Sequence, residues 1–238
     1  MTIPYVADCA GYHLLGGSEA ASLANIVDAA KPLVKVGTPT YPAAHYAVCN
    51  FNAELQGFRT TDSFSNKAST AIIFCTAPRN AADSNWSVGN IYPLSTNAGA
   101  YNLRWLSGSQ HLWRAGTPPT YDLDTGVDPT RRAVYNPDND PGARIFGPHR
   151  FAMHAMVDTG TETRLAIQEG HQIKGFTGPT AQATVSTPWF FGGQTVGGTR
   201  DAVIRVAAIA YYDRTLTFAE LGEVYNYVWG EIVARGAS

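Results

Sequence analysis

Cysteine is scarce in this sequence, and its three residues, Cys9, Cys49 and Cys75, lie far apart along 238 positions. An odd number leaves at least one thiol outside any disulfide, and no two cysteines have the spacing of a metal-binding pair. Cys75 ends the apolar run Ala71–Phe74, where a small core side chain fits. We therefore predict reduced, buried thiols without a redox role.

A charge of one sign is also lacking. The chain has 17 Lys and Arg against 19 Asp and Glu, a net charge of -2, and 15% charged residues. This balance provides no electrostatic attraction for nucleic acid or for an anionic membrane surface. No run of about eighteen consecutive apolar residues occurs, which argues against a membrane-spanning helix. We expect neither nucleic-acid binding nor membrane insertion.

Several familiar motifs are missing as well. Residues Met1–Asp8 have neither the basic region nor the apolar core of a secretion signal, so we expect synthesis and folding in a cytoplasm. The sequence contains no Gly-x-Ser-x-Gly elbow, no phosphate loop and no dinucleotide fingerprint. These absences argue against the corresponding hydrolase and nucleotide-binding classes.

Turn residues and short apolar runs are abundant. The 23 Gly and 14 Pro imply many turns between short strands, and a hydrophobic content of 45% suffices for a sizeable core. No linker, charge run or internal repeat divides the chain. Because all-β sandwiches of this length occur as one unit, we predict that residues 1–238 form a single domain.

Roughly ten or more short strands are expected, without an alternating strand–helix rhythm, which favours stacked antiparallel sheets. The clearest is Thr70–Thr76, a buried strand that ends before Pro78. Ser18–Ala30 is ambiguous, because helical spacing and an edge strand over Leu23–Asp28 both fit. The other expected strands are Tyr46–Phe51, Gly57–Thr61, Trp86–Leu94, Ala100–Leu106, His111–Ala115, Arg150–Asp158, Arg164–Glu169 and His171–Phe176.

The chain ends in a long apolar strand, Ala202–Tyr212, followed by an amphipathic helix. Arg205 is the one charged residue of this strand, so we expect it to lie centrally, covered on both faces. Thr217 stands three residues before Glu220, which is the spacing of a capping box. Gly236 is a plausible helix stop. The apolar residues at helical spacing are Leu221, Val224, Tyr225, Val228 and Ile232.

The run Ile209–Glu220 resembles the closing signature of laminin G-like domains in the concanavalin A-like lectin superfamily, in which a strand ending in Tyr-Asp-Arg leads into a helix. Phe151–Asp158, Thr163–Gln168 and Trp189–Gly193 resemble the same family's order of strand, hairpin and Gly-Gly step. The resemblance covers the second half of the chain well. It implies an all-β, antiparallel jelly-roll β-sandwich with a C-terminal amphipathic α-helix.

This superfamily contains lectins, glycan hydrolases, adhesion modules and viral surface proteins, so the fold does not fix the function. The related hydrolases place their paired carboxylates on one strand as Glu-x-Asp, and this chain has no glutamate followed two residues later by aspartate. We expect no catalytic residues. A glycan hydrolase with carboxylates from separate strands, and a purely structural cement protein, are kept as alternatives.

Two acidic runs have the spacing of calcium loops. Asp122–Asp128 and Asp138–Gly142 place oxygen ligands on alternate residues near a glycine. Neither has a glutamate at the twelfth loop position, and such runs are more often plain turns. His149 and His154 with Asp158 suggest zinc, but His154 shares a strand face with apolar neighbours, which favours a core or interface histidine. We expect no cofactor and no metal, and keep calcium as the alternative.

The proline-, aspartate- and arginine-rich segment 116–148 is long for a connection inside a compact domain, which is typical of a functional or packed loop. Lectin surfaces stack sugar C–H faces on Trp or Tyr and bond the hydroxyls with Asn, Asp and Arg. Trp113 stands at the mouth of this segment and is the candidate platform; the alternative is that it packs under the loop or in a subunit contact. The candidate ligand-binding residues are Trp113, Arg114, Asp122, Asp124, Arg131, Arg132 and Tyr135.

Together these features predict a non-enzymatic binding or assembly module with host-surface carbohydrate as the candidate ligand. Stand-alone, signal-less chains with this resemblance are similar to bacteriophage virion proteins, which implies a tail or capsid decoration protein on the virion surface, assembled in the host cytoplasm. A surface rich in Tyr, Trp and Arg suits protein contacts, so we expect a homo-oligomer that also contacts other virion proteins.

Overall fold

The computed structural model describes residues 2–50, 56–64, 68–76, 94–95, 121–123, 133–135, 151–159, 162–169, 172–179, 187–193 and 203–237. In these segments the strands form a large sheet, a smaller sheet and a two-stranded ribbon, and every pairing is antiparallel. The predicted fold class, an all-β sandwich closed by a C-terminal helix, is confirmed.

The large sheet runs in the order β12 (Gln172–Pro179), β11 (Glu162–Glu169), β10 (Phe151–Asp158), β6 (Ser69–Thr76), β14 (Val203–Tyr212), β4 (Tyr46–Asn50) and β3 (Thr40–Ala43), and β1 (Cys9–Leu14) also pairs with β14. The smaller sheet runs β2 (Val34–Val36), β5 (Gln56–Phe64), β13 (Thr187–Gly193) and β7 (Leu94–Ser95). The ribbon pairs β8 (Tyr121–Leu123) with β9 (Ala133–Tyr135). The helical segments are η1 (Val6–Asp8), α1 (Glu19–Leu23) and α2 (Phe218–Ala234).

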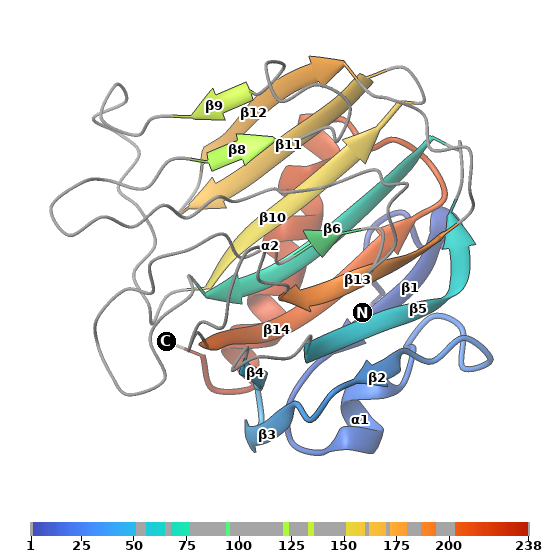
Figure 1. The fold of residues 1–238 in the computed structure, drawn as a ribbon, viewed down its shortest axis with the longest axis vertical. Helices are drawn as coiled ribbons and strands as arrows, with labels where there is room; N and C mark the ends of the chain where they lie inside the picture. Colours follow the sequence, from blue (N-terminus) through green and yellow to red (C-terminus); the bar gives the residue numbers. More distant parts are fainter. Residues whose placement is uncertain are drawn as a thin grey trace, which may run out of the picture.

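Strand β14 lies at the centre of the large sheet (Figure 1). It pairs with β6 along one side. On the other side β4 pairs with its first half, from Val203 to Val206, and β1 with its second half, from Ala208 to Tyr212. All ten of its residues are buried except the half-buried Arg205. The predicted central position, covered on both faces, is confirmed.

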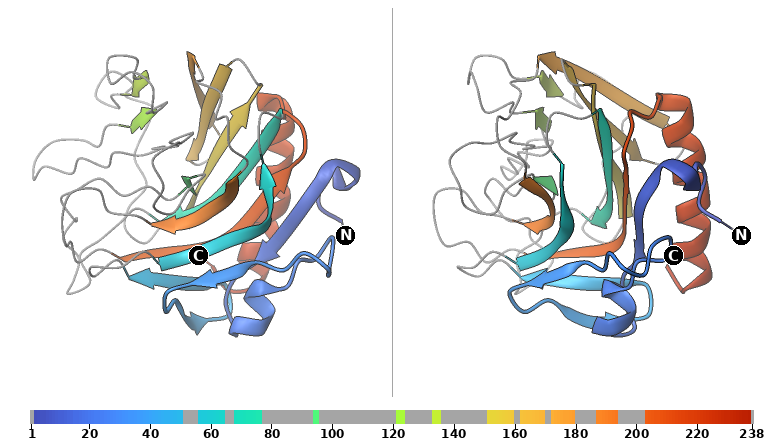
Figure 2. Two further views of the ribbon diagram at one scale, coloured as in Figure 1. Left: turned by 45° about the vertical axis from the view of Figure 1, so that its right-hand side comes forward. Right: turned by 90° about the vertical axis from the view of Figure 1, so that its right-hand side faces the viewer.

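Helix α2 covers one face of the large sheet, and the smaller sheet covers the other (Figure 2). Alternate residues of β14 therefore meet different partners. Ala208, Ala210 and Tyr212 belong to the core cluster that contains the apolar stripe of α2. On the opposite face, the ring of Tyr211 stacks on that of Phe191 from β13, with centroids 6.3 Å apart.

The predicted capping box of α2 is confirmed. The Glu220 N–H donates to the Thr217 hydroxyl over 3.2 Å, and the Thr217 N–H donates to the Glu220 carboxylate over 2.7 Å. The predicted apolar stripe is buried against the sheet. The helix ends at Ala234, and Gly236 follows with a φ of 105°. Neither α-helix in the described segments is long and apolar enough to cross a membrane.

The N-terminal region resolves the ambiguity over residues 18–30. Ser18 caps α1 by accepting a hydrogen bond from the Ala21 N–H, so the helical interpretation is correct there and the edge strand over Leu23–Asp28 is wrong. The chain after α1 is held by the buried Asn25. Its side-chain oxygen accepts from the Tyr12 N–H of β1 over 3.2 Å, and its amide donates to the carbonyls of Ala10 and Lys31.

Candidate functional site

Most of the predicted ligand-binding residues lie outside the described segments. These are Trp113, Arg114, Asp124, Arg131 and Arg132.

Asp122 and Tyr135 lie in β8 and β9, where Asp122 is opposite Val134 and Tyr135 is opposite Tyr121. The ribbon stands beside β12 (Figure 1). The segment predicted as a functional loop thus contains two strands of its own, and its role as a binding site stays a prediction.

The space between the two sheets is filled by side chains in the described part of the sandwich. Phe58, Phe191, Ile73, Ile209 and Tyr211 are all buried there, with at most 1% of their surface exposed. No aspartate or glutamate whose side chain the structure describes is buried. A catalytic carboxylate pair between the sheets therefore has no candidate among these residues.

The buried histidines are core residues. His154 is 1% exposed, which confirms the prediction of a core histidine, and burial lowers its pKa to about 4. His13 is also fully buried, with its pKa lowered to about 4 by the same desolvation, and its Nδ1 bonds the Ala24 carbonyl over 2.9 Å. Both rings are therefore neutral near pH 7. No group of His, Cys, Asp and Glu suited to a metal occurs among the described residues.

All three cysteines are free thiols and buried, as predicted. Burial raises the pKa of Cys9 to about 12 and raises the pKa of Cys49 and of Cys75 well above the ordinary range. The thiolate is the reactive form of cysteine, so these three protonated thiols are poor nucleophiles near pH 7.

A different set of residues forms a candidate site on the helix-facing side of the large sheet, near the C-terminal end of α2. We call it the basic–aromatic cluster, and its members are His45, Tyr46, Phe151, Arg205 and Arg235. The Arg205 guanidinium carbon lies 4.9 Å from the centroid of the Tyr46 ring. The Tyr46 and Phe151 rings have centroids 6.1 Å apart and are tilted by 42°. His45 packs edge-on against both rings, at 4.8 and 6.1 Å.

Local backbone structure places His45 and Tyr46. The pair Ala43–Tyr46 closes the turn between β3 and β4. Gly16 lies against this turn with a φ of 114°, and a Cβ there would be 2.5 Å from the Tyr46 nitrogen. The Gly17 N–H donates to the Ala43 carbonyl over 2.7 Å. Only glycine at position 16 combines this φ with this close approach.

Arg205 reaches the cluster from β14. Its main-chain N–H donates to the Thr76 hydroxyl over 3.1 Å, which ties the strand to the end of β6. Its side chain is half-buried, and no carboxylate in the described segments forms an ion pair with it. A partly desolvated guanidinium without a carboxylate partner is an unusual arrangement, because a buried charge is costly unless it is paired.

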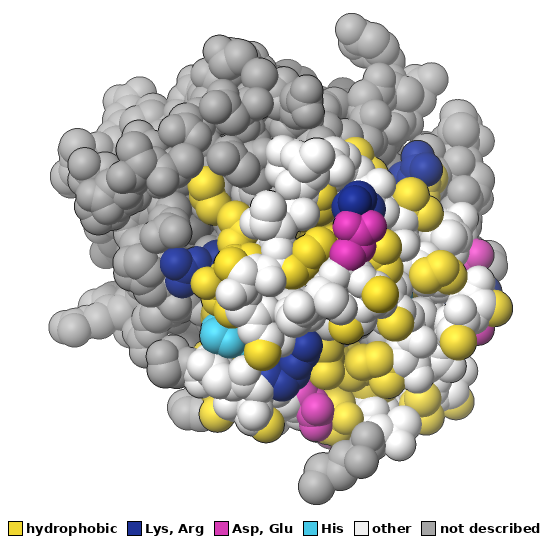
Figure 3. Space-filling view, turned by 90° about the horizontal axis from the view of Figure 1, so that it is seen from below, with side chains coloured by type: hydrophobic (Ala, Val, Ile, Leu, Met, Phe, Trp, Pro, Cys, Tyr) yellow, Lys and Arg dark blue, Asp and Glu magenta, His cyan; other side chains and the backbone are white. Residues whose placement is uncertain are grey.

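Positive charge is concentrated around His45. Partial burial, together with Arg205 and Arg235, lowers the pKa of His45 below its usual value. Arg235 itself is half-buried, and desolvation lowers its pKa. Its Nη1 donates a long 3.4 Å hydrogen bond to the Leu15 carbonyl. Figure 3 shows histidine surface with basic and hydrophobic side chains beside it. The cluster is therefore a cationic surface with aromatic walls.

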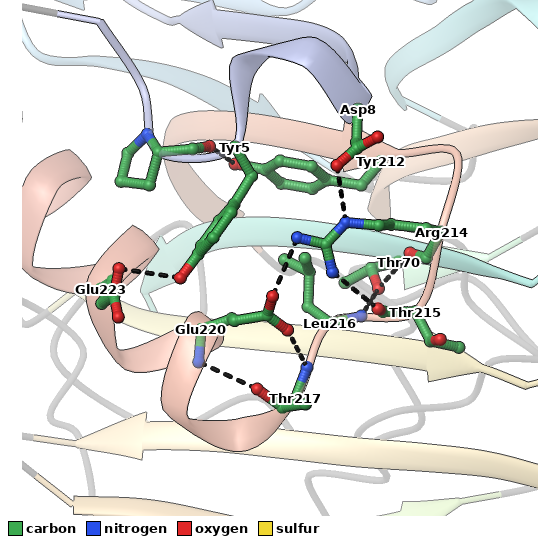
Figure 4. Close-up of polar contacts among 11 residues, drawn as sticks. Tyr5, Asp8, Thr70, Tyr212, Arg214, Thr215, Leu216, Thr217, Glu220 and Glu223 are labelled. Carbon is green, nitrogen blue, oxygen red and sulfur yellow. Dashed lines mark hydrogen bonds and ion pairs between the residues drawn. The ribbon is translucent and has the colours of Figure 1, made fainter.

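A second arginine shows the opposite arrangement (Figure 4). Arg214 donates through Nε to Asp8 over 2.8 Å and through Nη2 to Glu220 over 2.9 Å. Its Nη1 donates to the Thr215 carbonyl, and its guanidinium lies 4.9 Å above the Tyr5 ring. Arg214 is thus fully engaged in joining the N-terminal segment to the start of α2. It is a structural residue, whereas the Arg205 side chain forms no ion pair with the described residues.

Sequence reasoning did not identify the basic–aromatic cluster. Its members come from positions between 45 and 235, and no local pattern joins them. One signal was present, because Arg205 is the single charged residue in a strand that is otherwise apolar on both faces. A charge at such a position indicates either a buried ion pair or a site.

No family model matches the chain, and no curated protein matches it. Among solved structures, the binding domain of botulinum neurotoxin DC in complex with rat synaptotagmin II matches with a TM-score of 0.59 and 9% identity, over 94% of this chain and 52% of that chain. A structure of botulinum neurotoxin type C, whose cell entry depends on two ganglioside molecules, matches with a TM-score of 0.56 and 11% identity, over 94% and 52%. The binding domain of Paraclostridial Mosquitocidal Protein 1 gives 0.55 and 14%, over 93% and 52%.

At these identities the likeness establishes a shared β-rich fold. The chain spans about half the length of these three structures. None of the three is named as a laminin G-like domain or a phage protein. The β-sandwich part of the sequence-based resemblance is therefore confirmed, and the laminin G-like family and the virion setting stay predictions.

Proposed function

We propose that this chain is a non-enzymatic carbohydrate-binding module. The observation that carries the proposal is the basic–aromatic cluster, where Arg205 stacks on the Tyr46 ring without a carboxylate partner in the described segments. Binding sites for small molecules combine aromatic walls with a few placed polar groups. Here the rings of Tyr46 and Phe151 offer apolar surface for sugar C–H groups, and the guanidinium offers hydrogen-bond donors.

The solved structures support this reading by analogy. Two of the three named above are binding domains, and the third is from a toxin whose cell entry depends on two ganglioside molecules. The fold alone does not transfer a ligand from one protein to another. The proposal therefore rests on the side chains of this chain, and the likeness adds that the same architecture serves surface recognition elsewhere.

Two other functions compete with the proposed carbohydrate-binding module. A glycan hydrolase needs two carboxylates flanking the scissile bond, and no described carboxylate side chain is buried between the sheets. A structural cement protein needs no ligand, and the filled space between the sheets is compatible with it. Arg205 has no ion-pair partner among the residues that the structure describes, which favours the binding module over cement, because a purely structural arginine at this depth is expected to be paired, as Arg214 is.

The test is a glycan array on the purified protein, with and without EDTA. We expect binding that EDTA does not remove, and loss of that binding in Arg205→Ala. The matched control is Arg59→Ala, because Arg59 is an exposed arginine on β5 of the smaller sheet. Absence of binding under both conditions would contradict the proposal. Binding that requires metal would point to the acidic runs of segment 116–148.

The loop site predicted from sequence is tested in the same experiment. If Trp113→Ala abolishes binding and Arg205→Ala leaves it intact, the ligand binds at the predicted loop and not at the basic–aromatic cluster. The virion surface location, the single-domain organisation and the homo-oligomer are carried forward as predictions from sequence. Light scattering on the purified chain tests the oligomer directly.

A further inference from the structure

The basic–aromatic cluster is chemically biased toward one kind of sugar. Arg205, Arg235 and His45 converge on it from three different elements. Among the described carboxylates, that of Glu231, one turn before Arg235 in α2, acts on the pKa of Arg235, and none acts on that of His45. The positive charges of Arg205 and Arg235 provide a favourable potential for a ligand anion.

Resting on the binding function proposed above, we infer that this cluster recognises the carboxylate of an acidic sugar, with Arg205 as its hydrogen-bonding partner. The class is a sugar whose ring carries a carboxylate, such as a sialic or uronic acid.

The geometry of Arg205 suits a carboxylate. A guanidinium carries its N–H donors in its own plane, and a carboxylate accepts two of them in parallel. With its carbon 4.9 Å from the Tyr46 centroid, the guanidinium rests on the ring. No side-chain donor of Arg205 has a hydrogen-bond acceptor among the described residues. The hydrogen bond from Arg205 to the Thr76 hydroxyl is donated by the main-chain N–H. Stacking thus restrains the group and leaves its donors for the ligand.

The aromatic rings distinguish a sugar acid from a bare anion. Phe151 and Tyr46 are half-buried, and their tilt of 42° gives two apolar surfaces at an angle beside the guanidinium. A carboxylate held at Arg205 places the attached sugar ring against these surfaces. Phosphate has the charge but no C–H face, so it gains nothing from the rings.

The experiment compares an acid with its uncharged counterpart. Amide resonances of the ¹⁵N-labelled protein are followed during titration with N-acetylneuraminic acid and, separately, with its methyl ester, which keeps the ring and removes the charge. We expect the acid to bind roughly ten- to a hundredfold more tightly than the ester, the range given by a charge-assisted hydrogen-bond pair. Glucuronic acid against glucose repeats the comparison on a second acidic sugar.

Variants locate the effect. Arg205→Ala is expected to bring the acid down to the affinity of the ester, and Arg59→Ala is expected to leave the ratio unchanged. Arg205→Lys keeps the positive charge but loses the planar pair of N–H donors, so it should retain only part of the preference for the acid over the ester. If Arg205→Ala fails to fold, Arg205→Lys and Phe151→Ala carry the same test, the latter weakening acid and ester together.

The outcomes separate this inference from the proposed function. Equal affinity for acid and ester in the wild type overturns the inference, while any saccharide binding that depends on the cluster still supports the module. Inorganic phosphate that binds as tightly as the sugar acid also overturns it, because the rings then contribute nothing. If no saccharide shifts any resonance and the array is blank, both fail together.

Discussion

At the scale of single residues, Gly11 and Gly230 make a matched pair. A Cβ on Gly11 would lie 2.1 Å from the ring of Tyr211, which is buried and stacked near His13 and Phe191. Because that ring has no room to move, Gly11→Ala is expected to lower the free energy of unfolding by about 2 kcal/mol. A Cβ on Gly230 meets nothing within 4 Å. Gly230→Ala should therefore raise the free energy of unfolding by about 1 kcal/mol.

Urea unfolding followed by tryptophan fluorescence measures both variants. Equal stability of Gly11→Ala and wild type would show that the Tyr211 ring is less tightly held than the packing indicates.

His45 provides a second prediction at this scale. Burial, Arg205 and Arg235 depress its pKa in that order, a hydrogen bond to the Arg235 backbone raises it, and the rings of Tyr46 and Phe151 also face it. Removing one cation relieves part of the depression, so Arg205→Ala should raise the pKa of His45 toward its ordinary value. Titration of the imidazole signals by NMR measures the change.

The same titration in the presence of a bound acidic sugar should change the pKa of His45 in a defined direction. A carboxylate next to the imidazole raises the pKa of His45, so the affinity for the anion increases as the pH falls through the range between the bound and free pKa values. Arg59→Ala should leave the pKa of His45 unchanged. A lower pKa in Arg205→Ala would contradict the electrostatic account.

At the scale of elements, the start of α2 is set by a short local pattern. Thr217 and Glu220 satisfy each other's main-chain N–H groups, and Arg214 with the cap lowers the pKa of Glu220 to about 2. Thr217→Ala should cost about 1 kcal/mol of folding free energy. Thr215→Ala is the control, because the Thr215 side chain makes no hydrogen bond to the described residues. Similar loss in both variants, measured by thermal unfolding, would contradict a role for the cap.

The elements also show where sequence reasoning works. Capping and helical spacing act over a few residues, so α2 could be predicted almost to its ends. Strand β1 was missed, because Cys9–Leu14 contains Gly11 and has no simple alternation. Its burial is nearly continuous and is created by β14, Asn25 and α2, which lie elsewhere in the chain. Strand β1 is therefore determined by its tertiary contacts and not by the intrinsic strand propensity of its residues.

For the molecule as a whole, the sandwich could be predicted because the alternation of strands and turns is distributed along the chain. The candidate site could not, because its five side chains meet only after β4, β10, β14 and the end of α2 are assembled. The loop residues proposed from composition stay a prediction, since composition shows which chemistry is available and not where it converges.

The whole molecule also has a predictable response to acid. His13 and His154 are buried with pKa values lowered to about 4, against 6.5 for the unfolded chain. The unfolded state therefore binds more protons below about pH 6.5, and stability falls as the pH decreases through this range toward 4. Near pH 5.5 each histidine should contribute a slope of about 1.2 kcal/mol per pH unit, since one proton corresponds to 1.36 kcal/mol.

His154→Leu isolates one of the two contributions, because it replaces a buried imidazole with an apolar side chain that does not titrate. We expect the slope of unfolding free energy against pH, measured by urea denaturation between pH 5 and 6.5, to fall by about 1.2 kcal/mol per pH unit near pH 5.5 in this variant. His45→Gln, at a half-exposed position, should change the slope much less. An unchanged slope in His154→Leu would mean that His154 is protonated inside the fold, which requires a buried anion beside it and a different account of the sandwich interior.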